Sequence, residues 1–271
     1  MPAVRASEWV AAGYFAYLLL VAFVTLPGSR RRRAVQFCLA SLLIVLLPRA
    51  IPANAPWREP LRDWLPAVSL LMGYWLSGHY FTAPMPAIER RFLAFDRWLY
   101  AAGLSAWVAR APRLVLELLE LAYLSCFLFV PGGMVLLLLG GAIAHADRFW
   151  TLVLIGEFGS FGMLPWIQTR PPRDVEPPGV IDERRLVVRD INQKMVRTTS
   201  IGVNTFPSGH VAGSLAVALA VSEALPALAV PMVVGAGLIS LSTVVGRYHY
   251  AVDAIAGVAL TLTAWIIIRI L

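Results

Sequence analysis

Long uncharged stretches alternate with short charged ones along the whole chain. About eight apolar segments stand out, at residues 9–26, 34–47, 64–83, 114–144, 149–167, 208–225, 227–245 and 253–268. A helix needs roughly 20 mainly apolar residues to cross a bilayer, and a chain in lipid must satisfy its own backbone hydrogen bonds. We therefore predict an all-α fold, a polytopic membrane helix bundle.

One stretch breaks this pattern and predicts a different kind of helix. Between residues 87 and 113, large apolar side chains such as Phe95 and Trp98 are mixed with charged ones. This mixture favours an amphipathic helix lying in the head-group layer, with a loop packed over the spans as the alternative. We accordingly expect an N-terminal part, residues 1–112, with membrane segments and this interfacial helix, and a second helix bundle, residues 113–271.

The longest polar connection runs from residue 170 to 206. Its middle, residues 182–199, predicts a short amphipathic helix rich in arginine. Long connections in compact proteins are often lids or binding loops, although a solvated charged face would have the same composition. Both interpretations stay open at the level of sequence.

The composition indicates a membrane protein and narrows its partners. The chain is 59% hydrophobic and 14% charged, with a formal net charge of +7. Anionic lipid head groups explain this charge better than nucleic acid, for which the chain has no motif. Cys38 and Cys126 lie inside apolar stretches and resemble small core residues, and no spacing of Cys or His indicates a metal. We expect an integral multi-pass protein of a bacterial-type plasma membrane, with neither metal nor other cofactor.

The candidate chemistry begins at Pro207-Ser208-Gly209-His210, which opens an apolar segment. Ser208 is a favourable N-cap, and Gly209 lets a ligand approach the backbone closely. The free N–H groups of a first helical turn attract anions. This short motif predicts an anion site with His210 beside it, although a capped helix with an incidental histidine would look the same.

Two further polar segments end apolar stretches in the same way. His249 and Asp253 are four residues apart, so they share one face of a helix, and a carboxylate orients and stabilises a neighbouring imidazole. Arg247 precedes this pair, and Arg170 and Arg173 follow another apolar segment. The planar guanidinium of arginine suits phosphate oxygens.

Together these segments resemble the signature motifs of the type 2 phosphatidic acid phosphatase superfamily, which includes the vanadium-dependent haloperoxidases. The first motif of that family is Lys, six residues, then Arg-Pro. Arg170-Pro171 matches it, whereas Met163 stands at the Lys position, and Arg173 is a candidate replacement. The second motif, Pro-Ser-Gly-His, is complete at 207–210.

The third motif of the family is Ser-Arg, five residues, His, three residues, Asp. Ser242, His249 and Asp253 match it, Thr243 stands at the Arg position, and Arg247 offers a guanidinium nearby. The Arg-Tyr-His-Tyr order is closest to the inositol-phosphorylceramide-synthase-like branch. The motifs cover about the last hundred residues, so the first half carries only general similarity.

The resemblance implies phosphoryl transfer through a phosphohistidine. It assigns His249 as nucleophile, Asp253 as its orienting carboxylate and His210 as general acid and base. It assigns phosphate binding to Arg170, Ser208 and the Gly209 N–H. We add Arg173 and Arg247 as candidate phosphate ligands, because they could replace the Lys and Arg that the motifs lack here. A lipid phosphate or diphosphate is the expected substrate, and a membrane-embedded member is not expected to hold vanadate.

The acceptor and the reaction class stay open. Water as acceptor gives a lipid phosphatase, whereas a lipid alcohol gives a phosphotransferase. A transporter with His and Arg along a polar path is the alternative outside enzymology, although the chain lacks the inverted repeat of many transporters. Oligomeric state is not predicted by any feature of the sequence.

Charge gives two conflicting predictions for the side of the membrane. Parity of the segments places Arg30 to Arg33, a stop-transfer anchor on lipid phosphates, on the same face as the motif loops. The positive-inside rule makes that face cytoplasmic, whereas the resemblance implies an extracytoplasmic site.

Three carboxylates need separate explanations. Glu157 lies within an apolar segment, which marks it as a candidate functional residue or as the partner of an arginine. Glu117 and Glu120 are three apart, and we expect them to be interfacial or to pair with Arg110 or Arg113.

Overall fold

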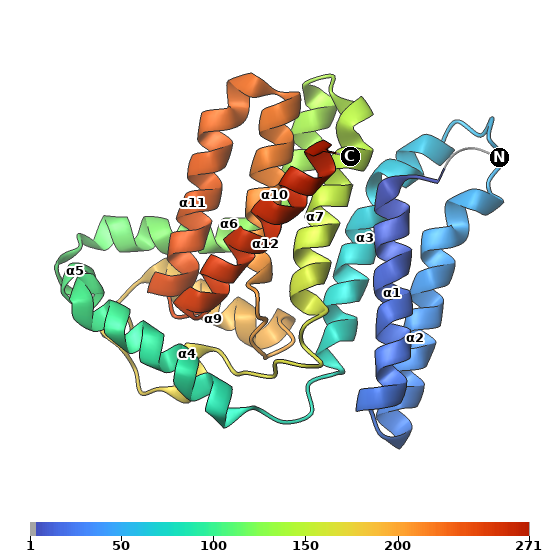
Figure 1. The fold of residues 1–271 in the computed structure, drawn as a ribbon. Coiled ribbons are helices and arrows are strands. Elements are labelled where there is room, and N and C mark those ends of the chain that lie inside the picture. The colour runs from blue at the N-terminus through green and yellow to red at the C-terminus, as the bar shows by residue number, and fades with distance from the viewer. Residues whose placement is uncertain (1–3, 271) are drawn as a thin grey trace.

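The computed structural model describes residues 4–270, whose regular structure is helical throughout (Figure 1). The α-helices are α1 Ala6–Thr25, α2 Gly28–Leu46, α3 Arg58–Gly78, α4 Pro86–Leu99, α5 Ser105–Arg110, α6 Arg113–Leu139, α7 Ala146–Phe161, α8 Pro172–Val175, α9 Val187–Thr199, α10 Gly209–Ala224, α11 Ala229–Val245 and α12 Ala251–Ile270. Short 3-10 turns (η1 Leu47–Ala50, η3 Ile143–His145, η4 Pro226–Leu228) and a π-helical turn (η2 Tyr100–Leu104) join some of them. The all-α prediction is confirmed.

Five helical segments are long and apolar enough to cross a membrane. They are α1, α2 continued by η1 (Gly28–Ala50), α6, η4 continued by α11 (Pro226–Val245), and α12. Helices α3, α7 and α10 run beside them (Figure 1), but α7 and α10 have 16 residues each and α3 starts with charged side chains. The chain is thus a multi-pass membrane protein, while the count of about eight apolar segments stays a prediction.

Helix α10 lies at the centre of the C-terminal part and contacts α6, α7, α11 and α12. Its residues are small and apolar on all sides, as expected for a helix surrounded by others. Gly156 of α7 lies against Ala212, and a Cβ at Gly213 would collide with Glu157. These small residues let α7 and α10 approach closely, which fixes the position of the polar motif where α10 begins.

The N-terminal helices form a second packed layer. Helices α1 and α2 make an antiparallel hairpin, and both α1 and α3 pack against α7 (Figure 1). Tyr14 stacks on Phe158 with ring centroids 3.9 Å apart, and the Tyr80 hydroxyl donates to the carbonyl of Leu18 at 2.6 Å. The division at residues 112 and 113 stays a prediction, and the outer ends of both parts lie outside the described residues.

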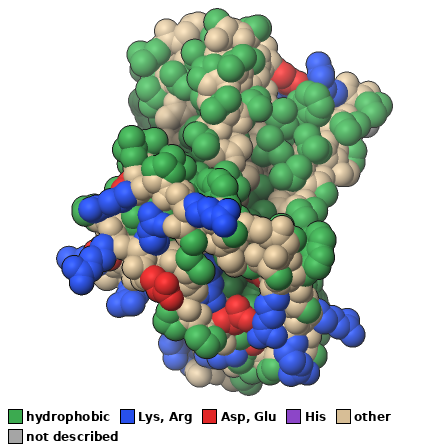
Figure 2. Space-filling model, turned by 90° about the vertical axis from the view of Figure 1, so that its left-hand side faces the viewer, with side chains coloured by type: hydrophobic (Ala, Val, Ile, Leu, Met, Phe, Trp, Pro, Cys, Tyr) green, Lys and Arg blue, Asp and Glu red, His purple; other side chains and the backbone are tan. Residues whose placement is uncertain are grey.

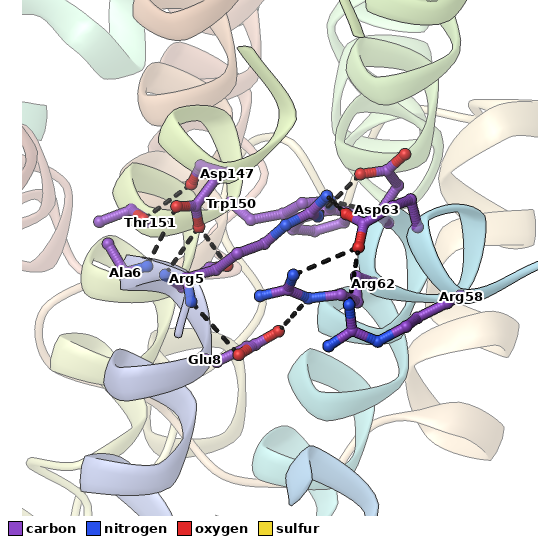
Figure 3. Close-up of polar contacts among 11 residues, drawn as sticks. Arg5, Ala6, Glu8, Arg58, Arg62, Asp63, Asp147, Trp150 and Thr151 are labelled. Carbon is purple, nitrogen blue, oxygen red and sulfur yellow. Dashed lines mark hydrogen bonds and ion pairs between the residues drawn. The ribbon is translucent and has the colours of Figure 1, made fainter. Parts of the chain in front are cut away.

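A polar network ties three helix starts together at one end of the bundle (Figure 3). Arg5 binds Asp63 of α3 at 2.7 Å, and Arg62 binds Glu8 of α1 at 2.7 Å. Asp147 of α7 accepts from the backbone N–H groups of Ala6 and Ser7. Acidic side chains are favoured at helix N-termini, so this network fixes the relative heights of α1, α3 and α7.

Helices α4 and α5 cross the other end of the bundle instead of running along it (Figure 1). The predicted amphipathic helix at 87–113 is present as two helices, α4 and α5, separated by a kink at Gly103 (φ 137°). Leu93 is buried, whereas Trp98 is 63% and Trp107 42% exposed. Charged side chains gather at this lower end of the molecule, below a largely apolar surface (Figure 2). The location of α4 and α5 in the head-group layer stays a prediction.

Candidate active site

Three connections bring the polar motifs to the same end of the bundle, where α4 lies (Figure 1). The three segments are the beginning of the α7–α10 connection, its end together with the start of α10, and the α11–α12 turn. Asn204 N–H donates to the carbonyl of Thr169 at 2.9 Å, so the two ends of the long connection lie side by side. The Ser208 N–H donates to the carbonyl of Asp253 at 3.0 Å, which fixes the start of α10 against the start of α12.

His249 and Asp253 form the best-defined pair of the site. Asp253 Oδ2 lies 3.5 Å from His249 Nδ1 and accepts hydrogen bonds from Asn204 Nδ2 and from the Tyr250 N–H, both at 2.9 Å. Asp253 is completely buried, and His249 is 7% exposed. The carboxylate is therefore held by two donors and directs Nδ1 of the ring, leaving Nε2 for other chemistry.

The environment of His249 keeps its imidazole neutral. Burial, and secondarily the positive charge of Arg173, lowers the pKa of His249 to about 3. Within residues 4–270, neither His249 Nδ1 nor Asp253 Oδ1 has a hydrogen-bond partner. A neutral ring beside a carboxylate is the state that a histidine nucleophile requires.

His210 lies across from His249 at the start of α10. The two rings meet edge to face, with centroids 5.5 Å apart. Ser208 caps the helix by accepting from the Val211 N–H at 3.4 Å. The Tyr123 hydroxyl lies 3.4 Å from His210 Nε2, and the Tyr123 ring stacks on Tyr248 at 3.6 Å. Two histidines thus face one another between aromatic side chains.

The three arginines singled out in the sequence have different surroundings. Glu89 of α4 binds the Arg170 guanidinium through both oxygens, at 3.1 and 2.8 Å, and these bonds lower the pKa of Glu89. Arg247 is held by Asp182 at 3.1 Å and Glu176 at 3.5 Å. Two of the three guanidinium groups are therefore already bound to carboxylates.

Arg173 lies beside Tyr248, the residue before His249, and its Nη1 donates to the Tyr248 carbonyl at 3.5 Å. Its guanidinium lies 5.4 Å from the Tyr248 ring centroid, and its charge acts on the pKa of His249. Its nearest carboxylate, Asp174, is 3.9 Å away and half-exposed. Of the candidate phosphate ligands, Arg173 is thus the least committed to another side chain.

The sequence did not indicate the buried network behind Tyr248. Glu120 binds Arg189 of α9 at 2.6 Å and accepts from the Tyr248 hydroxyl at 2.6 Å. Our expectation that Glu120 pairs with Arg110 or Arg113 is therefore wrong, although Glu117 does pair with Arg113, at 3.4 Å. No sequence motif marks Arg189, because its partners lie far away along the chain.

Two other buried residues near the site, Asn204 and Glu157, have surroundings that the sequence did not predict. Asn204, which orients Asp253, carries no motif signal and is found only through the fold. Glu157 has no arginine partner in the described part of the chain; its carboxylate instead lies against the positions of Gly209 and Gly213. Residues 4–270 contain no cluster of three metal-ligating side chains.

Comparison with known proteins places this arrangement in a family. The sequence model of the PAP2 superfamily matches residues 90–267, which include most of α4, both histidines and all three arginines. The chain belongs to the PAP2 superfamily. Its members are phosphatases or phosphotransferases, and this PAP2 chain has the helices of a membrane protein.

The individual relatives give narrower support. A PA-phosphatase related-family protein of Dictyostelium discoideum is 41% identical over 58 residues, 21% of this chain and 10% of that protein. The chain therefore matches about a tenth of the length of this curated relative. No solved structure matches the chain significantly.

Proposed function

We propose that the protein is a membrane-embedded lipid phosphatase that cleaves a lipid phosphate or diphosphate through a phosphohistidine. The observation that carries this proposal is the His249–Asp253 pair facing His210 at the end of an apolar helix bundle. PAP2 membership supports the reaction class, and the apolar bundle supports a lipid substrate.

The proposed chemistry divides the work between the two rings. His249 Nε2 attacks phosphorus, and the bond from phosphorus to the leaving oxygen breaks while His210 gives that oxygen a proton. Water then attacks the phosphorus while His210 takes its proton. The phosphorus–nitrogen bond breaks, its electron pair returns to His249 Nε2, and phosphate leaves. Asp253 stabilises the positive charge on His249 while the phosphate is attached.

Charge on the transferred phosphoryl group must be neutralised by fixed donors, which is most of the catalysis in such reactions. We assign Arg173 first, because it lies beside Tyr248, next to His249 in the chain, and its nearest carboxylate, at 3.9 Å, is more distant than those of Arg170 and Arg247. Arg170 is 42% exposed and can offer its remaining N–H groups while Glu89 holds it. Ser208 and the Gly209 N–H complete the set at the start of α10, and Arg247 contributes when it releases a carboxylate partner.

A second candidate is a phosphotransferase that moves a phosphate-bearing head group to a lipid alcohol. The Arg247-Tyr248-His249-Tyr250 order favours it, because this order resembles the inositol-phosphorylceramide-synthase-like branch. The chemistry would be the same up to the phosphohistidine, and only the acceptor would change.

The test is phosphate release by the purified full chain in detergent. A panel of lipid phosphates and diphosphates is supplied with no alcohol acceptor, and His249→Ala serves as the inactive control. Phosphate release by the wild type, but not by His249→Ala, in the absence of an alcohol acceptor supports the phosphatase. Release that appears only after a lipid alcohol is added, as a transferred product, supports the phosphotransferase, and no turnover in either condition contradicts both.

A further inference from the structure

A separate cavity opens at the same end of the bundle as the histidines but between α2 and α3. It has a volume of about 490 Å³. Its lining comes from the start of α2, the end of α3 and the segment before the Pro-Ser-Gly-His motif, namely Arg30, Arg33, Trp75, Gly78, His79 and Ile201. Pockets for small molecules and head groups lie in this size range.

The lining has the chemistry of an anion site. Arg30 and Arg33 are three residues apart, so both side chains project from one face of α2. The pKa of His79 is lowered, first by burial and then by the charges of Arg33 and Arg30, which places the three groups close together. Among the residues that the structure describes, no carboxylate lines the cavity to neutralise these three groups.

The surroundings indicate a ligand that belongs partly to the membrane. Trp75 is 50% exposed and borders the cavity, and tryptophan is enriched where a bilayer meets water. Arg30 donates to the carbonyl of Phe81 at 3.0 Å, which leaves its other N–H groups for a ligand. Helix α2 continues from here as an apolar segment long enough to span a bilayer, so acyl chains could extend along it.

The cavity also shares a wall with the segment that supports Asp253. The Ile201 N–H donates to the Tyr74 hydroxyl at 3.0 Å, and Gly78 has no room for a Cβ beside Ile201. Three residues later, Asn204 donates to Asp253. A ligand that contacts Ile201 would therefore restrict the backbone that leads to the two histidines.

We propose that this cavity binds the phosphate of an anionic phospholipid head group, at a site separate from the catalytic histidines. Arg30 and Arg33 bind the phosphate oxygens, and Trp75 contacts the glycerol and the upper acyl chain. This is a defined binding site, unlike a general attraction of basic residues to the bilayer, because only two of the four consecutive arginines line it.

The experiment measures equilibrium binding of phosphatidylglycerol to the full chain in a neutral detergent. The His249→Ala background prevents turnover of the probe. Phosphatidylcholine of the same chain length and inorganic phosphate are titrated in parallel. We expect saturable binding of phosphatidylglycerol that is at least about tenfold tighter than either, since each tenfold is about 1.4 kcal/mol.

Variants separate this site from general charge attraction. The Arg30→Gln/Arg33→Gln double variant should lose the tenfold preference, whereas Arg32→Gln, on the same turn of α2 but outside the cavity, should keep most of it. Equal losses in both would overturn the proposal and leave surface attraction. Equal binding of phosphatidylglycerol and phosphatidylcholine by the wild type overturns it without any variant.

A second measurement uses only the wild type, so its result does not depend on whether the variants fold. Hydrogen–deuterium exchange of a peptide covering residues 198–206 should slow when phosphatidylglycerol is added to the wild type, because Ile201 lines the cavity. Unchanged exchange there would contradict the proposal. Equal slowing by inorganic phosphate would overturn the lipid assignment in favour of a soluble anion.

Discussion

The two histidines differ in the groups that support them, and this difference sets their proposed roles. His249 is backed by Asp253, which Asn204 holds in place, whereas His210 is next to the hydroxyl of Tyr123. A carboxylate stabilises the cation that forms when a ring becomes phosphorylated. His249 is therefore suited to be the nucleophile, and His210 to move protons.

This division predicts different failures for the two variants. His249→Ala should abolish turnover and leave no label on the protein, because within residues 4–270 His249 is the histidine that pairs with Asp253. His210→Ala should slow turnover yet accumulate an acid-labile phosphoenzyme from a substrate whose leaving group needs no proton. Rapid quenching with a radiolabelled activated phosphate ester measures this, and normal turnover by His249→Ala would refute the assignment.

Arg173 tests which guanidinium group carries the phosphate. Because Arg170 and Arg247 are bound to carboxylates, Arg173→Ala should lose about 2–4 kcal/mol of transition-state stabilisation, the size of one preorganised donor. Arg185→Ala removes an exposed arginine from the same long connection and serves as the control. The measurement is kcat/KM for both variants; an Arg173→Ala enzyme as active as the control would exclude this role.

At the scale of elements, α4 is joined to the catalytic bundle through the start of α12. Asp96 accepts a hydrogen bond from the Ala251 N–H at 2.9 Å, and it is only 5% exposed. Burial raises the pKa of Asp96 from 3.8 to about 7. The packing of α4 against the start of α12 is therefore linked to protonation of the Asp96 carboxylate.

The sign of this coupling gives a pH-dependent prediction. Between pH 3.8 and about 7 the folded protein holds a proton on Asp96 that the unfolded chain has released, so stability falls as pH rises through this range. Asp96→Asn keeps the acceptor and removes the titration. The variant should be more stable than the wild type at pH 8 by about 1–3 kcal/mol and nearly equal to it at pH 4, on a scale of 1.36 kcal/mol per pKa unit.

The measurement is the free energy of unfolding in detergent at both pH values. Other carboxylates contribute equally to both proteins and cancel in the difference. Asp190→Asn, at an exposed position of α9, controls for the loss of one charge. A difference between wild type and Asp96→Asn that does not change with pH would show that Asp96 does not titrate in this range.

The elements themselves were largely predictable, whereas their pairings were not. Apolar stretches and the Ser208 cap indicated where helices lie, because these signals are local. The ion pairs from Glu120 to Arg189 and from Glu89 to Arg170 join residues far apart in sequence, and no periodicity encodes such pairs. The motifs indicated His249 and Asp253, but Asn204 became evident only when the fold placed it beside Asp253.

At the scale of the whole molecule, the proposed catalytic groups lie at the end of apolar helices and beside α4. Phe95 and Trp98 of α4 are 37% and 63% exposed, and their rings are 5.6 Å apart. Aromatic side chains of this kind are stable where head groups meet acyl chains. A lipid could then present its phosphate to the histidines while its chains remain in the bilayer.

This geometry predicts that kcat/KM for one head group rises with acyl-chain length. A lipid that stays in the bilayer avoids exposing its chains to water, at about 0.8 kcal/mol per CH₂, whereas a short soluble ester gains nothing from the apolar surface. The preference for long chains should fall in Phe95→Ser/Trp98→Ser, while activity on a short soluble ester is retained. Trp57→Ser, an exposed tryptophan just before α3 at the opposite end of the bundle, is the matched control and should keep the full preference. A flat profile from short to long chains in the wild type would mean that the substrate is soluble, and an equal loss in Trp57→Ser would remove α4 from its recognition.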